Sequence, residues 1–306
     1  MGVRLRIARL LQRLLAVLVC LTAAAPAGAA AVTDMLGRSL TLPDRSLRVV
    51  SLAPSLTEAA FALGRGDWLV GITDVCNYPP ATQDKPRVGA IGAPNLERIV
   101  DLRPDLVLVT AEGNSRETMW QLERLRIPVF AVAPEGYADV LASLRVLGAA
   151  LQAEAAAAVV VERIEADVAK IRRAVAGRPH PRALYLIWTD PLIAAGPGTF
   201  IHDLLELAGG ANVVRGSVPY PRIGWEEVVA AAPEVILVAA HRDEPDGAME
   251  AALRDAWRTW QSVPAIRAGR IVAIPADSIL RPGPRVADGL ARLAMALHPE
   301  VAGRRP

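Results

Sequence analysis

Short runs of apolar residues alternate with amphipathic stretches along most of the chain after residue 34. In the first half these runs predict buried strands over Arg48–Ala53, Trp68–Thr73, Asp105–Thr110 and Val129–Ala133, and a helix over Ser115–Arg126. In the second half they predict strands over Ala183–Trp188, Val235–Ala239 and Ile271–Ile274, and a final helix over Arg285–Leu297. Short buried strands that are separated by helices favour parallel sheets.

Two early segments carry local signals of their own. Residues 34–47 have alternating apolar positions and predict a short hairpin that turns at Gly37. After the first strand, the spacing of Ser55 and Glu58 predicts a capping box, in which Ser55 opens a helix and Glu58 reaches back to its first amide. That helix is expected to stop at Gly64.

One stretch departs from the alternation of strands and helices. Residues 152–176 are rich in Ala, Glu, Val, Arg and Ile, contain no Gly or Pro, and are followed by Gly177 and Pro179. This composition predicts a single helix of about 25 residues, roughly 37 Å long at ~1.5 Å per residue.

Two segments on either side of this helix match each other without a gap. Asn95–Val109 aligns with Gly224–Val238 at a constant offset of 129 positions, and the glutamate, the proline, the acid after it and the apolar strand coincide. Matches of this length also arise by chance, or from the helix–strand pattern that is common to α/β proteins. The simpler interpretation is an α/β protein of two similar lobes, 34–150 and 179–300, with mainly parallel sheets, bridged by one long backbone helix within 151–178.

The first thirty residues differ from the rest of the chain. Four arginines and no acid precede an apolar run over Leu14–Ala25, and small residues follow it. This is the layout of a cleavable signal peptide, 1–30, with cleavage near Ala29 or Ala30, and it predicts a periplasmic protein. The apolar run is shorter than the ~20 residues that a membrane-spanning helix needs.

Two alternatives to a cleaved leader stay open. The segment would also serve as an uncleaved amphipathic anchor, and Cys20 would also serve as a lipidation site. Val19 precedes Cys20 where a lipoprotein signal has a small residue, and more apolar residues follow it, so lipidation is the weaker hypothesis.

Removal of the leader changes the charge and the cysteine count. The full chain has a formal net charge of +2, and loss of the four leader arginines takes it to −2. A mature chain of this charge gives no reason to expect a nucleic-acid partner. Cys76 is then the only cysteine, so an intramolecular disulfide is impossible.

The sequence contains none of the common catalytic motifs. It has no phosphate loop, no G-x-S-x-G elbow and no H-E-x-x-H pair. Its four histidines lie in the second half at spacings that give no helical pair, so we predict no zinc site and no resident cofactor. Two lobes form a cleft, and clefts bind small molecules. A binding protein is therefore favoured over an enzyme.

Several stretches resemble the periplasmic binding proteins for cobalamin and iron–siderophore complexes. They are Arg48–Glu58, Gly71–Pro80, Asn95–Val109 and, in the second half, Pro219–Pro221 ahead of Trp225 and Glu226. The resemblance runs over roughly residues 34–297, and the segment Asn77–Pro80 leans towards the cobalamin branch. It implies a monomer that captures cobalamin or a related corrinoid and delivers it to the permease dimer of an ABC importer in the inner membrane.

The resemblance also implies one docking glutamate on each lobe, which by motif are Glu97 and Glu226. A dimeric permease presents two equivalent basic spots, so a partner with two similar lobes needs one exposed acid on each. The same glutamates also suit the first turn of a helix, where the dipole favours an acid.

Ligand contacts transfer less completely from the family. Val75, Ile91 and Ser278 stand where the family often has aromatic residues, which thins the stacking surface for a corrin ring. Each of three residues also has a role that involves no ligand. Trp188 would pack in the core, Arg281 would be a solvated surface charge, and Cys76 would be a small buried filler. Arg281 is otherwise expected to meet a carboxylate, amide or phosphate of the ligand. The predicted ligand-binding residues are Val75, Cys76, Tyr78, Trp188, Tyr220, Asp277 and Arg281.

Three competing functions stay open. An iron–siderophore or haem receptor belongs to the same family. A two-lobed metal-cluster or chelatase-type enzyme has a similar shape, but the leader and the lack of an acid–base or nucleophile constellation weigh against it. A structural envelope protein is disfavoured because nothing repeats beyond the two lobes.

Overall fold

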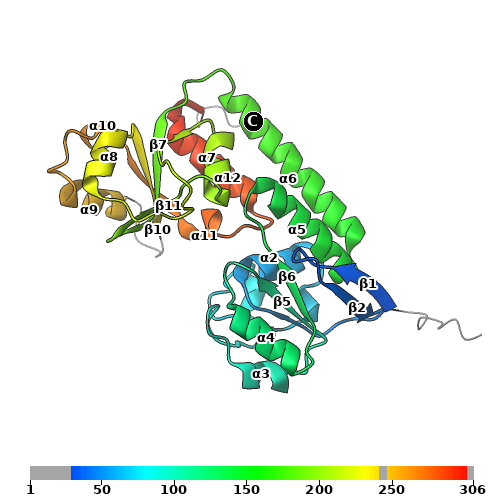
Figure 1. Ribbon diagram of the computed structural model, residues 1–306. Coiled ribbons are helices and arrows are strands. Elements are labelled where there is room, and N and C mark those ends of the chain that lie inside the picture. The colour runs from blue at the N-terminus through cyan, green and yellow to red at the C-terminus, as the bar shows by residue number, and fades with distance from the viewer. Residues whose placement is uncertain (1–28, 241–246, 302–306) are drawn as a thin grey trace, which may run out of the picture.

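The computed structural model describes residues 29–240 and 247–301, which form two α/β lobes connected by one long helix (Figure 1). The predicted leader lies outside the described residues, Cys20 included, except for Ala29 and Ala30, which begin the first strand. Among the described helices, none has both the length and the apolar character to cross a membrane. The predicted α/β fold class with two lobes is confirmed.

The N-terminal lobe is built on a four-stranded sheet in which every strand is parallel to its neighbours. Alternate side chains enter two apolar clusters. Val107 and Val109 pack under the helices 96–101 and 116–124, whereas Leu106 and Leu108 face the helices 54–62, 137–150 and 154–175. In pairing order the strands are β4 (Leu69–Ile72), β3 (Val49–Ser51), β5 (Leu106–Thr110) and β6 (Val129–Val132). The helices are α2 (Pro54–Ala62), α3 (Leu96–Asp101), α4 (Arg116–Arg124), α5 (Tyr137–Ala150) and two short 3-10 turns, η1 (Gly66–Trp68) and η2 (Pro80–Asp84).

A hairpin precedes this sheet, but it begins earlier than the sequence predicted. Its antiparallel strands are β1 (Ala29–Thr33) and β2 (Ser39–Pro43). The carboxylate of Asp34 accepts hydrogen bonds from the amides of Leu36 and Arg38, at 3.0 and 2.9 Å. These bonds make residues 34–38 the turn, with Gly37 at a left-handed φ of 77° as expected, and they move the first strand to the N-terminal side of Asp34.

The predicted capping box at Ser55 and Glu58 is wrong. Helix α2 begins at Pro54, its N-cap is Ala53, and no side chain caps it. Proline suits the first turn because its nitrogen has no hydrogen that would need a partner there. Glu58 therefore does not cap α2, and its carboxylate instead contacts arginines of the other lobe.

The C-terminal lobe repeats this architecture with one antiparallel edge. Strands β11, β10 and β7 are parallel, β9 adds two residues beside β7, and β8 runs antiparallel to β7. The strands are β7 (Arg182–Thr189), β8 (Leu192–Ala194), β9 (Ala211–Asn212), β10 (Val235–Ala240) and β11 (Ile271–Pro275). The helices are α7 (Phe200–Leu207), α8 (Trp225–Ala231), α9 (Ala248–Ala256), α10 (Pro264–Arg267), α11 (Ala276–Ile279), α12 (Val286–Leu297) and η3 (Pro299–Val301).

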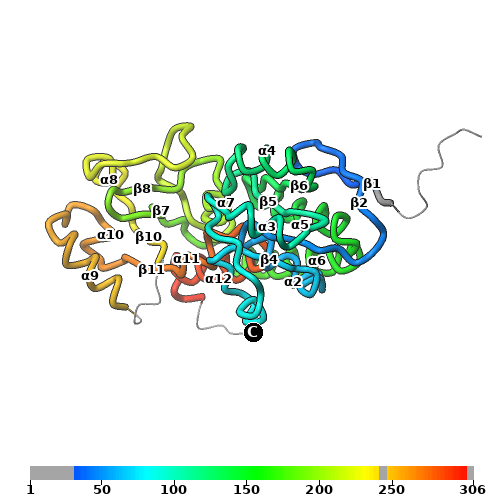
Figure 2. Tube along the Cα trace, turned by 90° about the horizontal axis from the view of Figure 1, so that it is seen from below, coloured from blue at the N-terminus to red at the C-terminus, as the bar shows by residue number. Residues whose placement is uncertain are grey.

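Helix α6 (Glu154–Val175) is the predicted long helix, and it packs against α5 of one lobe and α12 of the other. Its buried side chains recur at helical spacing, which makes one apolar stripe along its length. They are Ala157, Val161, Ile164, Val168 and Val175. At Gly148 of α5 the approach is so close that an added Cβ would lie 2.5 Å from the Cβ of Ala157. Seen from below, the two lobes lie side by side along one long axis (Figure 2).

The matching segments of the sequence are matching structures. Each is a helix followed by a strand inside a sheet, α3–β5 in one lobe and α8–β10 in the other. In the turn between them, Arg103 and Ala232 have left-handed φ values of 45° and 41°. The acid after the proline acts alike in both lobes, because Asp105 accepts the amide of Arg48 and Glu234 accepts the amide of Arg182, each at 2.8 Å.

Candidate ligand-binding site

A cavity of about 420 Å³ is lined by residues of both lobes. On the N-terminal side its walls follow all four parallel strands: Val75 lies after β4, Ala53–Ser55 after β3, Glu112 after β5 and Pro134 after β6. Ligands of open α/β sheets bind at the carboxyl ends of strands, and small-molecule sites usually enclose about 300–1,000 Å³. The cavity has the position and the size of a ligand site.

The C-terminal lobe supplies a mostly apolar wall. Ile187 comes from β7, Phe200 and Ile201 from the start of α7, and Tyr220 from the loop before α8. The segment 276–282, which follows β11, contributes the rest of this wall, with Asp277 its only acid. Such a surface offers apolar contact with few polar groups to orient a ligand.

Four of the seven residues predicted to bind the ligand line this cavity: Val75, Tyr220, Asp277 and Arg281. Cys76 does not, because it is buried in the core of its loop. Its sulfur lies 3.2 Å from the hydroxyl of Thr57 and 3.1 Å from that of Thr73. This is the arrangement of a small buried filler.

The two other predicted aromatic contacts also lie off the cavity wall. Tyr78 is half exposed, and the guanidinium of Arg285 covers its ring at 4.3 Å from the ring centre. It faces a second hollow, which α6 helps to line. Trp188 is half exposed near the end of β7, and its indole nitrogen donates to the carbonyl of Asp190 at 2.8 Å. Its neighbour Ile187 lines the cavity, so Trp188 flanks it.

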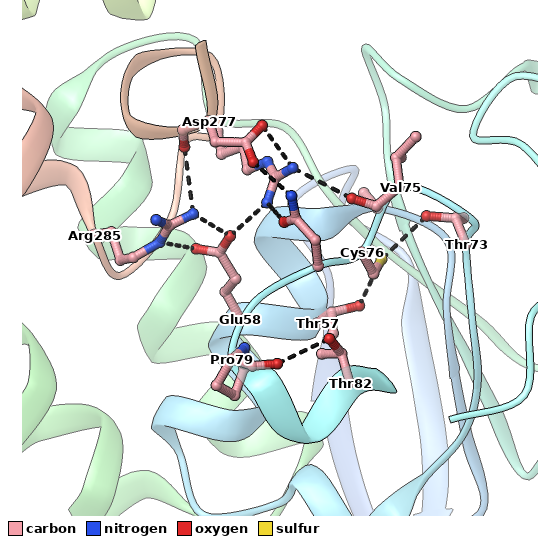
Figure 3. A network of polar contacts seen from close by, with 12 residues as sticks. Thr57, Glu58, Thr73, Val75, Cys76, Pro79, Thr82, Asp277 and Arg285 are labelled. Carbon is pink, nitrogen blue, oxygen red and sulfur yellow. Dashed lines mark hydrogen bonds and ion pairs between the residues drawn. The ribbon is translucent and has the colours of Figure 1, made fainter. Parts of the chain in front are cut away.

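A buried carboxylate joins the two lobes beside the cavity (Figure 3). Glu58 of α2 accepts two hydrogen bonds from Arg285, at 2.8 and 2.6 Å, and one from Arg281 at 3.0 Å. The side chain of Glu58 is 2% exposed, so its charge depends on these two arginines. The hydrogen bond to Glu58 is the main cause that raises the pKa of Arg285 above its ordinary value.

The guanidinium of Arg281 has four partners among the described residues. Besides Glu58, its guanidinium donates to Oδ1 of Asn77 at 2.7 Å and to the carbonyl of Val75 at 3.2 Å, and it pairs with Asp277 at 2.7 Å. Asn77 also donates to Asp277 at 2.8 Å. The arginine that was expected to meet a ligand therefore already holds the two lobes together.

A second polar pair faces across the cleft at Tyr220. The hydroxyl of Tyr220 lies near the carboxylate of Glu112 in the other lobe, and both residues line the cavity. Burial of the phenol raises the pKa of Tyr220 to about 12, and the negative charge of Glu112 adds to this effect. Glu112, Glu58 and Arg285 were not among the predicted site residues. Only the position of Glu112, directly after a buried parallel strand, would have singled it out.

The two predicted docking glutamates lie exposed in the first turns of α3 and α8. Other side chains cap these helices. In α3, Asn95 accepts a hydrogen bond from the amide of Arg98 at 2.9 Å. In α8, Glu227 accepts one from the amide of Gly224 at 2.6 Å. Within the described part of the chain, Glu97 and Glu226 make no hydrogen bond or ion pair. Figure 1 places both helices on the side of their lobes away from α6.

Residues 29–240 and 247–301 contain no group of three or more His, Cys, Asp or Glu side chains arranged to hold a metal ion. The candidate site is therefore a cavity with an apolar majority, three charged side chains and one cross-cleft tyrosine. Such an arrangement can hold a bulky ligand by contact and orient it with a few hydrogen bonds.

The chain is similar to known binding proteins in its family pattern, in its overall sequence and in its structure. The sequence pattern of the family described as "Periplasmic binding protein" matches residues 49–278. The vitamin B12-binding protein of Vibrio cholerae serotype O1 is 27% identical over 260 residues, which cover 84% of this chain and 91% of that protein.

Two solved structures are also similar over most of their length. The periplasmic vitamin B12 binding protein BtuF of Vibrio cholerae has a TM-score of 0.73 and 25% identity, over 85% of this chain and 99% of that one. The periplasmic haem-binding protein RhuT of Roseiflexus sp. RS-1 has a TM-score of 0.74 and 29% identity, over 84% and 100% of the two chains.

Proposed function

The chain belongs to the periplasmic binding protein family, and from this premise we propose that it captures cobalamin or a related corrinoid and delivers it to the permease of an ABC importer. Proteins of this family bind solutes, so a metal-cluster or chelatase-type enzyme is not proposed. The observation that carries the proposal is the cavity at the carboxyl ends of both sheets, in a chain whose curated relatives are vitamin B12-binding proteins.

We assign the ligand contacts to the cavity wall. Val75 and Tyr220 approach the ligand from opposite lobes, and Asp277 and Arg281 form the polar part of the floor. A ligand that extends beyond the cavity would reach Trp188 beside Ile187, where stacking on an aromatic face adds ~0.5–1.5 kcal/mol beyond area burial. Cys76 and Tyr78 are not included, because their side chains lie away from this wall.

Calorimetric titration with cyanocobalamin tests the ligand assignment. We expect saturable binding at micromolar concentrations, with a matching shift in the visible spectrum of the corrin. The absence of heat at tens of micromolar, together with binding of a ferric siderophore or haemin, would move the assignment to the iron branch of the family.

Haem is the second candidate ligand. The observation in its favour is sequence identity, which is 29% to the haem-binding protein RhuT and 25% to the solved vitamin B12 binding protein. The absorbance spectrum of whatever copurifies with the protein separates the two candidates, because haems, corrins and ferric siderophores absorb at different visible wavelengths.

Delivery is proposed to use Glu97 and Glu226 as the two docking acids of a monomer. They occupy equivalent positions of the two lobes, are exposed, and have no partner among the described residues. One acid on each lobe fits a permease dimer with two equivalent basic spots.

Export is proposed to use residues 1–30 as a cleavable signal peptide. Support comes from the family, whose members are periplasmic, and from the arginine-rich start with its short apolar run. The intact mass of the protein from the envelope fraction tests this. We expect a chain that starts near Ala30 or Ala31, whereas Met1 retained in a cytosolic fraction or a lipid on Cys20 would contradict it.

A further inference from the structure

The charges that line the cavity do not balance. Among its lining residues the structure describes two acids, Glu112 and Asp277, and one base, Arg281. The part of the wall that the structure describes therefore carries a negative formal charge. Solvent screens such charges in the empty cleft, but a ligand that fills the cavity displaces that solvent, so the imbalance affects which ligands bind.

Arg281, the one base among the described lining residues, has little capacity left for an incoming anion. Arg281 pairs with Asp277 at 2.7 Å and with Glu58 at 3.0 Å, and it donates to Asn77 at 2.7 Å. Its side chain is 11% exposed. A ligand carboxylate would have to displace one of these partners and leave a buried or half-buried acid without its base, which is costly.

Glu112 is the acid of this wall that has no basic partner within residues 29–240 and 247–301. It lies exposed after β5, and no arginine, lysine or histidine of the described residues lies within ion-pair distance of it. The polar group that faces it across the cleft is the hydroxyl of Tyr220, which also lines the cavity and is uncharged at neutral pH. A carboxylate has about four acceptor positions, so it keeps room for donors from a ligand.

The two polar ends of the cavity lie on different strands. Val75, which accepts from Arg281, follows β4, whereas Glu112 follows β5, and β3 lies between these strands. The ends of β4 and β5 are separated by two strand spacings, about 10 Å at ~4.8 Å each. A flat ligand that fills the cavity thus meets a neutralised ion pair at one end and an uncompensated carboxylate at the other.

We infer that Glu112 sets the charge selectivity of the cavity, favouring chelates whose edge carries neutral or cationic hydrogen-bond donors and rejecting those whose edge carries carboxylates. This inference rests on the proposed function, because it assigns the charge class of the ligand in the same cavity. A macrocycle edged with amides donates to Glu112 through its N–H groups. A macrocycle edged with carboxylates, such as haem with its propionates, places like charges together.

The test compares two probes that share the corrin ring and differ in edge charge, with two further ligands beside them. Dicyanocobinamide carries amides, and dicyanocobyrinic acid carries carboxylates at the same positions; cyanocobalamin and haemin complete the set. Binding is measured by calorimetry on the full mature protein and on the variants Glu112→Gln and Glu112→Lys. Glu162→Lys is the control, because Glu162 is an exposed acid on α6, outside the cavity wall.

We expect the wild type to bind the amide ring about tenfold or more tighter than the carboxylate ring. Glu112→Gln keeps the shape of the side chain and should narrow this preference several-fold. Glu112→Lys should raise affinity for the carboxylate ring and for haemin by about tenfold or more, while the control leaves the wild-type preference unchanged. A preference that Glu112→Lys does not alter would overturn the inference.

The outcomes separate this inference from the proposed function. If the wild type binds none of the three corrinoids, the corrinoid assignment fails, and haemin alone tests the inference about Glu112. Tighter haemin binding by Glu112→Lys then supports charge selection, and unchanged haemin binding overturns it. The absence of binding of every probe to Glu112→Lys overturns it as well, since that variant should accept anionic rings.

Discussion

The carboxylate of Glu58 in the N-terminal lobe lies 2.6 Å from a guanidinium nitrogen of Arg285 in the C-terminal lobe. Arg281 reaches the same carboxylate at 3.0 Å, so one buried acid holds two arginines that are more than two hundred residues away in the chain. This cluster ties α2 to the segment between α11 and α12, beside the cavity rather than at the far ends of the lobes.

Replacement of Glu58 should therefore be expensive. Glu58→Gln leaves Arg281 and Arg285 without their shared counter-charge, and the loss of one partner of a buried ion pair typically costs about 3–5 kcal/mol. Because Arg285 is 23% exposed, we expect the lower end, about 3 kcal/mol, in chemical denaturation. The control is Glu165→Gln, which breaks an exposed pair with Arg145 and should cost about 0–1 kcal/mol. Equal effects of the two variants would show that the buried cluster contributes little.

Ligand binding should change the shape of the molecule very little. Bilobed receptors that close widely bend at flexible hinges, whereas here α6 packs on helices of both lobes and the Glu58 cluster joins them again. We expect small-angle scattering to give nearly the same radius of gyration with and without ligand. A contraction by several per cent would contradict this prediction.

Reversal of the docking acids should abolish uptake and spare ligand binding. Single exposed charge pairs contribute only about 0.2–1 kcal/mol, so one substitution should weaken uptake modestly. The double variant Glu97→Lys/Glu226→Lys should stop it through repulsion from the basic spots of the permease. Uptake into vesicles and titration with ligand are the two measurements, with Glu162→Lys on α6 as the charge-matched control.

Loss of ligand binding in the double variant would instead place these glutamates in the binding site. Uptake equal to that of the wild type would leave them as acids that stabilise the first turns of α3 and α8.

Tyr220 should titrate about two pH units above an ordinary tyrosine, at about 12 instead of about 10. A raised pKa in the folded state means that this tyrosine stabilises the fold fully below pH 10, and that the contribution is lost as the pH rises from about 10 to about 12. The ultraviolet absorbance of the phenolate measures it, and Tyr220→Phe identifies the band. Glu112→Gln should lower the value only in part, because burial is the larger cause. Titration near 10 in the wild type would show that the phenol of Tyr220 is not buried in the cleft.

Gly148→Ala should destabilise the protein although alanine favours helices. The added Cβ would lie 2.5 Å from the Cβ of Ala157, so α5 and α6 must move apart, and overpacking of this kind typically costs about 1–3 kcal/mol. Gly92→Ala is the control, because nothing lies within 4 Å of its Cβ, and it should stay within about 0.5 kcal/mol. Thermal and chemical denaturation of both variants compare the two sites.

The regular elements could be predicted because their signals are local. Each buried strand is a short apolar run, and α6 is a long stretch without Gly or Pro. The match between α3–β5 and α8–β10 extends to the left-handed turn at Arg103 and Ala232, which no composition rule would give. Local pattern and tertiary structure agree at these places, as expected where packing is the only demand.

The site was predicted less completely because it is made by contacts that are distant in sequence. Glu58 has the spacing of a capping acid, but a proline opens the helix and two arginines of the other lobe take the carboxylate. Tyr78 and Trp188 are aromatic residues of the expected kind, yet their side chains lie off the cavity wall. Glu112 belongs to no motif, and the role that we infer for it depends on a tertiary feature, the lack of a base beside it among the described residues.

The stiffness of α6 has a kinetic consequence for delivery. If the lobes keep one separation, loaded and empty protein present the same pair of carboxylates at α3 and α8, and a permease that recognises only these acids cannot distinguish cargo from no cargo. Empty protein then competes with loaded protein for the same membrane sites. At a fixed amount of ligand, uptake should rise with the concentration of the binding protein, pass through a maximum and decline as unloaded copies occupy the transporter.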